Sequence, residues 1–250
     1  MPTTTKRRKL SFKKILILFL VLYIIGCIIY YFVKLPIKNI YISGTINITD
    51  NEIIKAANIQ NYPSIFKYSS NKLEKNIQSL ALVKTAKVKK NIFGKLTIEI
   101  VENKTLFYNR NNSKIVLEDG NEVDSIENIY GYPILVNHVK DTVYEDLIAG
   151  LAKIDASTIN LVSEIIYSPI IKDNIIIDDS RFLLLMNDGN HVYINTVNIL
   201  KFNSYPDIYS TLEDKGILNM DSSTKEVFSF CVFGSCNQTG TPDGNGETYE

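Results

Sequence analysis

The stretch that decides the fold runs from Ile37 to Ile59 and reads IKNIYISGTINITDNEIIKAANI. Its first part alternates, with Ile40 and Ile42 on one face, and stops at Gly44, which predicts a short strand and a turn. The run from Thr49 to Glu52 (TDNE) then has the pattern of a capping box, in which the threonine oxygen accepts from an amide of the first helical turn. The sequence therefore predicts a strand followed by a helix.

Three further elements are expected downstream. Leu73, Ile77 and Leu80 follow Asn71 with helical spacing, so we expect a second helix that begins at Asn71. The alternating runs LVKTAKVKK and KLTIEIVE are separated by NIFG, which predicts a hairpin. The order strand, helix, helix, strand, strand over residues 36–105 defines the first predicted extracytoplasmic domain.

Upstream, residues 15–33 (ILILFLVLYIIGCIIYYFV) contain no charge. As a helix this run would be roughly 28 Å long, close to the hydrocarbon thickness of a bilayer. A cleaved signal peptide is the alternative, but the run is long for one and no small-x-small cleavage site follows it. Basic residues at positions 6–9, 13 and 14 precede the run. They predict that residues 1–14 form a basic cytoplasmic tail and that everything after Lys34 lies outside the cell membrane.

The charge balance hides an asymmetry. The chain has 27 basic and 27 acidic residues, but without the six N-terminal basic residues 21 basic residues stand against 27 acidic ones. A nucleic-acid-binding protein would carry a basic face on its folded part, so no nucleic-acid partner is expected. One basic run in the first domain has two interpretations, the solvated face of an amphipathic strand or a patch for lipid headgroups; it comprises Lys84, Lys87, Lys89, Lys90 and Lys95.

A β-rich second domain with a few helices is predicted over residues 106–234. Strand pairs are expected to turn at Asn111-Asn112, at Asp119-Gly120 and at 187–189, within RFLLLMNDGNHVYIN. STINLVSEIIYS also has β-like composition, whereas VYEDLIAGLAKI has helical spacing. NILKFNSYPDIYSTLEDK has helical spacing too, although Pro206 must interrupt or restart that helix.

The polar residues 235–250, which include Gly and Pro, predict a disordered tail. The fold class expected for the whole chain is a single transmembrane helix followed by an α+β ectodomain.

Few residues could support chemistry. His138, His191, Cys231 and Cys236 could together supply four zinc ligands, but the paired spacings of zinc sites are absent. A local disulfide between Cys231 and Cys236, or two free thiols, fits the sequence better than a metal. No phosphate-binding loop or nucleophile elbow is present either. We therefore expect no catalytic, cofactor-binding or metal-binding residue, and no enzyme.

Taken in order, these segments resemble the FtsQ/DivIB family of bacterial cell-division proteins, and the first domain resembles a POTRA domain. The segments that carry the resemblance beyond Ile37–Ile59 are LEKNIQSLALVKTAKVKKNIFGKLTIEIVENK, VLEDGNEVD followed by YPIL, LLLMNDGNHVYI with KFNSYPDIY, and KGILNM. Three positions depart from the family pattern: Phe93-Gly94 replaces a hairpin proline, ENKT replaces a Glu-Arg-x-Pro-like run, and Asn219 stands where aspartate is common.

The resemblance implies a divisome scaffold at the septum. Its partners would be small bitopic proteins similar to FtsL and to FtsB or DivIC, together with other divisome components, and it would help to regulate septal peptidoglycan synthesis. Two other functions remain open. One is a different membrane-anchored POTRA-type adaptor in sporulation or secretion, and the other is a cell-wall enzyme with an unrecognised site.

The family's partner adds a strand to the edge of the β domain near its C-terminus. Within GILNMDSSTKEVFSFCVFGSC (216–236), where β-forming residues precede a polar end, the corresponding edge is expected at Leu218 to Met220 and Glu226 to Phe233. We hypothesise that a partner strand pairs there because no later element is expected to cover the edge. The residues proposed for this edge are Leu218, Met220, Val227, Phe228 and Phe230.

Overall fold

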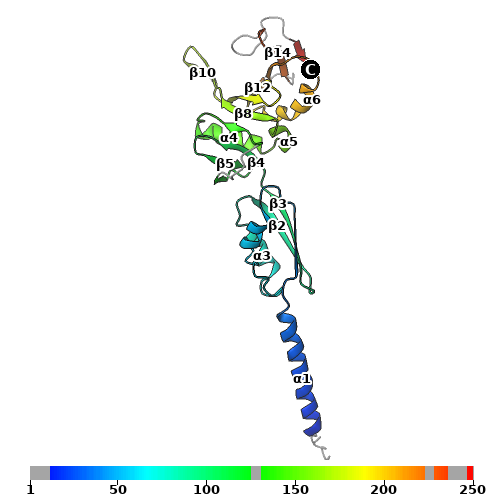
Figure 1. Cartoon of the computed structure of the whole chain (residues 1–250). Coiled ribbons are helices and arrows are strands. Elements are labelled where there is room, and N and C mark those ends of the chain that lie inside the picture. Colours follow the sequence, from blue (N-terminus) through cyan, green and yellow to red (C-terminus); the bar gives the residue numbers. More distant parts are fainter. Residues whose placement is uncertain (1–11, 125–130, 223–227, 236–246, 250) are drawn as a thin grey trace, which may run out of the picture. The chain divides into compact units, whose positions relative to one another are not determined.

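The computed structural model describes residues 12–124, 131–222, 228–235 and 247–249, and Figure 1 traces them in chain order. The chain divides into two compact units between Glu102 and Asn103. The first unit begins with helix α1 (Phe12–Val33), none of whose residues is buried. By length and composition α1 can cross a membrane, and it extends the predicted apolar run by three residues at its start. It indicates a single-pass membrane anchor.

The rest of the first unit contains the five predicted elements in the predicted order (Figure 1). Parallel pairing joins β1 to β3 and antiparallel pairing joins β2 to β3, so the sheet order is β1-β3-β2. The elements are β1 (Asn39–Ser43), α2 (Asp50–Ala56), α3 (Ser70–Ile77), β2 (Val83–Lys90) and β3 (Lys95–Glu102). The predicted strand–helix–helix–strand–strand arrangement is confirmed.

Helix capping follows the sequence closely, with one difference. The capping box at Thr49 is present, since its backbone amide donates to Glu52 Oε2 at 2.8 Å and its hydroxyl accepts from the Glu52 amide. The cap of α3, however, is Ser69 rather than Asn71, because the Ser69 hydroxyl accepts from the Lys72 amide at 3.2 Å. The α3 helix therefore begins earlier than predicted.

The core of the first unit lies between the two helices and one face of the sheet. Alternate strand residues point inward, as a half-buried sheet requires. The helices contribute Ile53, Leu73 and Ile77, and the strands contribute Val88, Leu96, Ile98 and Ile100, all of them buried.

A carboxylate closes the loop between β1 and α2. Both Glu102 oxygens accept hydrogen bonds, from the backbone amides of Ile46 at 2.7 Å and of Asn47 and Ile48 at 3.0 Å. The Asn47 side-chain amide adds a fourth donor at 3.1 Å. Gly44, with φ +87°, allows the same loop to approach β3, since a Cβ there would lie 2.0 Å from the Ile100 carbonyl oxygen.

The second unit is built on a ten-stranded sheet in the order β15-β14-β13-β12-β11-β8-β7-β4-β5-β6. Its strands are β4 (Thr105–Asn109), β5 (Lys114–Leu117), β6 (Glu122–Asp124), β7 (Ile134–Leu135), β8 (Val162–Tyr167), β11 (Arg181–Met186), β12 (His191–Asn195), β13 (Gly216–Asn219), β14 (Phe228–Val232) and β15 (Glu247–Tyr249). The strands β9 (Ile170–Lys172) and β10 (Ile175–Asp178) form a separate hairpin, visible beside the sheet in Figure 1.

Helical segments complete this unit and share its core with the sheet. They are α4 (Asp141–Leu151), α5 (Ala156–Ile159), the 3-10 helix η1 (Ile199–Ser204) and α6 (Tyr205–Tyr209). The core contains Leu147, Phe182, Leu184, Phe202 and Tyr205, each almost inaccessible to solvent. The predicted α+β class, with an anchor, a POTRA-type module and a β-rich domain, is confirmed.

Two local expectations concern helix and strand starts in this unit. The restart at Pro206 is confirmed, since this residue lies in the first turn of α6, where a missing amide costs nothing. The segment predicted as β-like from Ser157 instead begins in helix α5 and becomes a strand only at Val162.

Most of the predicted tail, 235–250, lies outside the described residues. Residues 247–249 form β15, which pairs antiparallel with β14. The structure differs there from the disorder that composition predicts, because pairing with a strand edge supplies the backbone hydrogen bonds that this short polar segment cannot make by itself.

The Glu102 contacts generate a prediction for the first unit. Glu102→Gln removes the charge and replaces one acceptor oxygen with a donor, so the loop amides lose part of their hydrogen bonding. We expect the unit's free energy of unfolding to fall by about 1–3 kcal/mol. Native-state hydrogen exchange of residues 36–102 in the detergent-solubilised full chain measures this change. Glu99→Gln on the same strand, which alters only an exposed ion pair with Lys89, should change it little.

Candidate partner-binding edge

Strand β13 determines where the C-terminal edge of the sheet lies. It pairs in parallel with β12, with Val192 opposite Leu218, and antiparallel with β14, with Leu218 opposite Phe230. Parallel neighbours need a crossover connection, which here consists of η1 and α6. The position of β13 therefore depends on contacts that fix both of its ends.

The first end of β13 is fixed by a buried amide. The Oδ1 atom of Asn190 accepts from the Gly216 backbone amide at 3.0 Å, and its Nδ2 donates to the Tyr205 hydroxyl at 3.2 Å. The Tyr205 hydroxyl in turn donates to Asp188 Oδ2 at 2.8 Å. Burial, more than the neighbouring carboxylate, raises the pKa of Tyr205, so the hydroxyl stays a donor at physiological pH.

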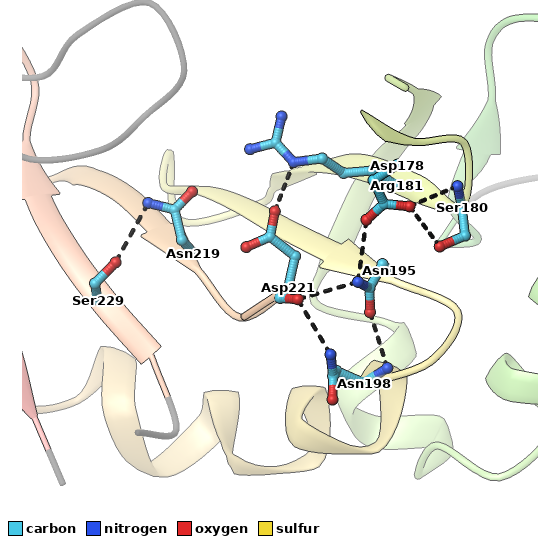
Figure 2. A network of polar contacts seen from close by, with 8 residues as sticks. All are labelled: Asp178, Ser180, Arg181, Asn195, Asn198, Asn219, Asp221 and Ser229. Carbon is cyan, nitrogen blue, oxygen red and sulfur yellow. Dashed lines mark hydrogen bonds and ion pairs between the residues drawn. The ribbon is translucent and has the colours of Figure 1, made fainter. Parts of the chain in front are cut away.

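The other end is fixed by an ion pair beyond the strand (Figure 2). Arg181 Nε lies 2.6 Å from Asp221 Oδ2, and both side chains are largely buried, with 7% and 15% of their surfaces exposed. The guanidinium also stacks 3.5 Å from the centre of the Tyr193 ring. Two side-chain amides, of Asn195 and Asn198, donate to the Asp221 carbonyl at 3.0 and 3.1 Å.

Asp178 connects this network to the β9–β10 hairpin (Figure 2). Its carboxylate accepts from the amide and hydroxyl of Ser180 at 2.8 and 2.7 Å and from the Asn195 side chain at 3.1 Å. Burial by itself would raise the pKa of Asp178, but these hydrogen bonds and the charge of Arg181 outweigh burial and lower the pKa. The network therefore stabilises the ionised form of the Asp178 carboxylate.

Close backbone approach joins β13 to β14. A Cβ on Gly216 would lie 2.1 Å from the Cys231 carbonyl oxygen and 2.7 Å from the Phe230 ring, so only glycine fits there. At the far end of the pair, the Asn219 side chain donates to the Ser229 hydroxyl at 3.4 Å (Figure 2). An amide at position 219 thus serves this cross-strand contact.

The side chains proposed from sequence for partner contact lie in the core. Leu218 and Met220 are fully buried, and Phe228 and Phe230 are 8% exposed. Val227 lies outside the described residues. The expectation that no later element covers β14 differs from the structure, since β15 pairs with residues 228–230. A strand that pairs with residues 228–230 on this side would therefore have to take the place of β15.

Two apolar side chains at the end of β14 are accessible. Val232 is 38% exposed and Phe233 is 42% exposed. The Phe233 ring packs edge-on against His191, with ring centres 4.8 Å apart, and its amide donates to the Lys215 carbonyl at 3.2 Å. Burial lowers the pKa of His191, which favours its neutral form and fits a role in packing. The sequence-based edge, which runs to Phe233, included both residues, but neither was named as a partner contact.

The cysteines and histidines give no metal site in the described parts of the chain. Cys231 is disulfide-bonded, whereas Cys27 on α1 is free; the predicted partner Cys236 lies outside the described residues. His138 is exposed between β7 and α4, and His191 lies on β12. Among the described residues no three His, Cys, Asp or Glu side chains group as metal ligands would.

Comparison with known proteins agrees with this architecture. The sequence profile of the POTRA domain, FtsQ-type, matches residues 35–103. The cell division protein DivIB of Bacillus subtilis is 31% identical over 239 residues, covering 89% of this chain and 87% of that protein. The chain belongs to the DivIB family of cell division proteins. This membership supports a role in cell division.

Other DivIB proteins match at similar levels. The DivIB of Listeria monocytogenes is 27% identical over 225 residues, covering 86% of this chain and 82% of that protein. Among solved structures, the major extracytoplasmic domain of DivIB from Geobacillus stearothermophilus is 23% identical and covers 45% of this chain and 95% of that domain, with a TM-score of 0.35.

Several residues that shape the edge were missed by sequence reasoning. Arg181 and Asp221 are forty positions apart, and nothing in the sequence pairs them. Gly216 precedes a β-forming run and resembles an ordinary turn glycine, whereas its role is close strand packing. One available signal was the buried position of Arg181 at the start of an apolar strand, because a buried arginine requires a partner.

The Arg181–Asp221 pair yields a stability prediction. Arg181→Met keeps apolar bulk over Tyr193 but leaves Asp221 without its cation, so we expect the second unit to lose about 3–5 kcal/mol. Native-state hydrogen exchange of β12 and β13 in the solubilised full chain measures the loss. Arg110→Met, at an exposed position of the same unit, is the matched control. Equal exchange in both variants would contradict a structural role for the pair.

Asp178 yields a pH prediction. Its folded-state pKa is below the unfolded value of about 3.9, so its ionised form contributes stability above that pH and the contribution is lost as pH falls through the folded pKa. Acid titration of the second unit, followed by hydrogen exchange, should show loosening of the β9–β10 hairpin below about pH 4. Asp178→Asn should flatten this pH dependence. An unchanged acid profile in that variant would show that other carboxyl groups control it.

Proposed function

We propose that this chain is a divisome scaffold that binds small bitopic division proteins similar to FtsL and to FtsB or DivIC through the edge of β14. It acts by binding rather than by catalysis and helps to regulate septal peptidoglycan synthesis. Its N-terminus is cytoplasmic, its two folded units are extracytoplasmic, and it is enriched at the septum. Membership in the DivIB family supports the cell-division part of this proposal.

The binding proposal rests on one observation, which is that only a short strand covers the outer side of β14. Its inner side pairs with β13 at four positions, whereas the strand on its outer side, β15, has three residues. Strand edges bind extended segments through the backbone, with side-chain pockets adding specificity. A partner strand longer than β15 that pairs along β14 would displace it, because both use the same edge.

The buried residues of this region hold the strands in place and are not available for contact with a partner. Leu218, Phe228 and Phe230 anchor β13 and β14 in the core, so the edge is a rigid template. The exposed Val232 and Phe233 continue the same strand and offer apolar contact for a partner side chain. Deleting the chain from Lys225 onward would remove two core phenylalanines, and loss of binding in that variant would not separate contact from folding.

Phe233→Asp tests the contact more sharply. The charge would be placed where we expect an apolar partner side chain, so affinity for the bitopic partner should fall about tenfold, equivalent to about 1.4 kcal/mol. Affinity is measured with full-length protein and partner in nanodiscs. Val197→Asp is the control, since Val197 is an exposed apolar residue of the same unit that lies outside β14. Equal affinities of the two variants would contradict the proposed contact.

Removal of β15 supplies a second prediction. A chain ending after Cys236 keeps β14 and both cysteines but lacks the strand that occupies the edge. Partner affinity should rise, because no internal strand competes for β14. Loss of partner binding on this truncation would contradict pairing in the place of β15. Fluorescent-fusion imaging of dividing cells tests the septal location separately, since a sporulation or secretion adaptor would not concentrate at the septum.

A further inference from the structure

The end of the POTRA-type unit where the chain enters from α1 has an unusual surface. We define this basal end as residues 35–39, 61–68 and 89–95. Backbone hydrogen bonds join the three segments: the Ile37 amide donates to the Pro63 carbonyl at 3.0 Å, and the Ile65 amide donates to the Leu35 carbonyl at 2.9 Å. The Lys38 amide donates to the Gly94 carbonyl at 2.8 Å, which connects the β2–β3 turn to the entering chain.

Large apolar side chains of the basal end face solvent. Phe93 and Ile92 at the tip of the β2–β3 turn are 74% and 56% exposed, and Tyr62 and Phe66 are 54% and 47% exposed. Most exposed apolar residues are scattered singly, whereas these four belong to segments that are bonded together. Neither Ile92 nor Phe93 belongs to the core of the unit.

The exposed tip is held in a defined conformation. The Phe93 amide donates to the Asn91 side chain at 2.8 Å, and Gly94 adopts φ +89° to complete the turn. The Lys90 ammonium donates to the carbonyls of Ile65 and Tyr68 at 3.0 and 2.7 Å, which ties the tip to the 61–68 segment. A tip that is already fixed in this way loses little conformational entropy when it binds.

The charge of the basal end has one sign. Its three segments contain five lysines, Lys38, Lys67, Lys89, Lys90 and Lys95, and no acidic residue. Lys89 pairs with Glu99 at 2.6 Å and Lys90 donates inward, whereas Lys38, Lys67 and Lys95 have exposed side chains. An anionic surface is the complement of this arrangement.

Chain connectivity brings the basal end to a membrane. Lys38 follows the last residue of α1, Val33, by five positions, so at most roughly 18 Å of extended chain separates them. If α1 spans the bilayer, the turn that is bonded to Lys38 stays close to the outer headgroups. Exposed aromatic and aliphatic side chains flanked by lysines are typical of interfacial binding to anionic lipid.

We propose that the basal end docks on the outer leaflet of the membrane. Ile92 and Phe93 enter the headgroup–acyl boundary, and Lys38, Lys67 and Lys95 lie over anionic headgroups. The docking rests on α1 as an anchor and is independent of partner binding at β14. It would limit the tilt of the POTRA-type unit on its short linker.

The chain contains no tryptophan, which makes a direct test possible. Phe93→Trp places a single tryptophan, which can be excited selectively over the tyrosines, at the tip of the full-length protein reconstituted into vesicles of phosphatidylcholine and phosphatidylglycerol. We expect blue-shifted emission, quenching by nitroxide-labelled lipids at a depth of roughly 5–10 Å, and protection from aqueous acrylamide. Ile46→Trp is the matched control.

The control position is exposed and lies in the same unit, away from the tip. Ile46 is 87% exposed, and its amide donates to Glu102 at the opposite end of β3 from Lys95. Seven residue steps separate these strand ends, roughly 24 Å. The control fluorophore should therefore emit as in water and be quenched by acrylamide.

Three outcomes would overturn the proposal. One is equal acrylamide quenching of both variants, and another is blue-shifted Phe93→Trp emission without lipid quenching. Protection that grows with protein density and persists in detergent would assign the tip to a second copy of the chain. The charge component is tested by replacing Lys38, Lys67 and Lys95 with glutamine. Lipid quenching of the tip should then lose its dependence on phosphatidylglycerol, and an unchanged dependence would contradict the role of the lysines.

Discussion

The C-terminal half of this protein depends on the placement of one short strand, β13. It has four residues and pairs in parallel with β12 on one side and antiparallel with β14 on the other. Four residues of pairing give little stability by themselves, so side chains fix the strand at both ends. Asn190 bonds its first amide, and the ion pair of Arg181 and Asp221 holds the chain just beyond its last residue. The edge at β14 exists because β13 is fixed.

Both folded units are held by a side-chain acceptor that binds backbone amides and by a glycine that allows close packing, although the residues differ. In the POTRA-type unit the Glu102 carboxylate collects the amides of the loop that leads into α2, and Gly44 lets that loop approach β3. In the β domain the Asn190 side chain and Gly216 have the corresponding roles at β13. In each unit a buried or half-buried acceptor satisfies loop amides, and a glycine permits close backbone approach. Mobility is thereby restricted at the loop that leads into α2 and at strand β13.

The sequence predicted the architecture better than the site. Apolar periodicity, the capping box at Thr49 and the turn residues are local signals, and they located the anchor, the five elements of the first domain and the β11–β12 hairpin. Strand order and burial are not local. The residues chosen for partner contact, Leu218 and Phe230 among them, have the β-forming character of an edge and the apolar character of a core, and the structure places them in the core. Composition also gave no sign that residues 247–249 would pair with β14.

We propose that a partner strand pairs with β14 in the place of β15. Hydrogen exchange of the full-length protein in nanodiscs, with and without the bitopic partner, measures this directly. When the partner binds, amides in residues 228–232 should become more protected and residues 247–249 should exchange faster. Unchanged exchange in both segments, with new protection elsewhere in the chain, would contradict it.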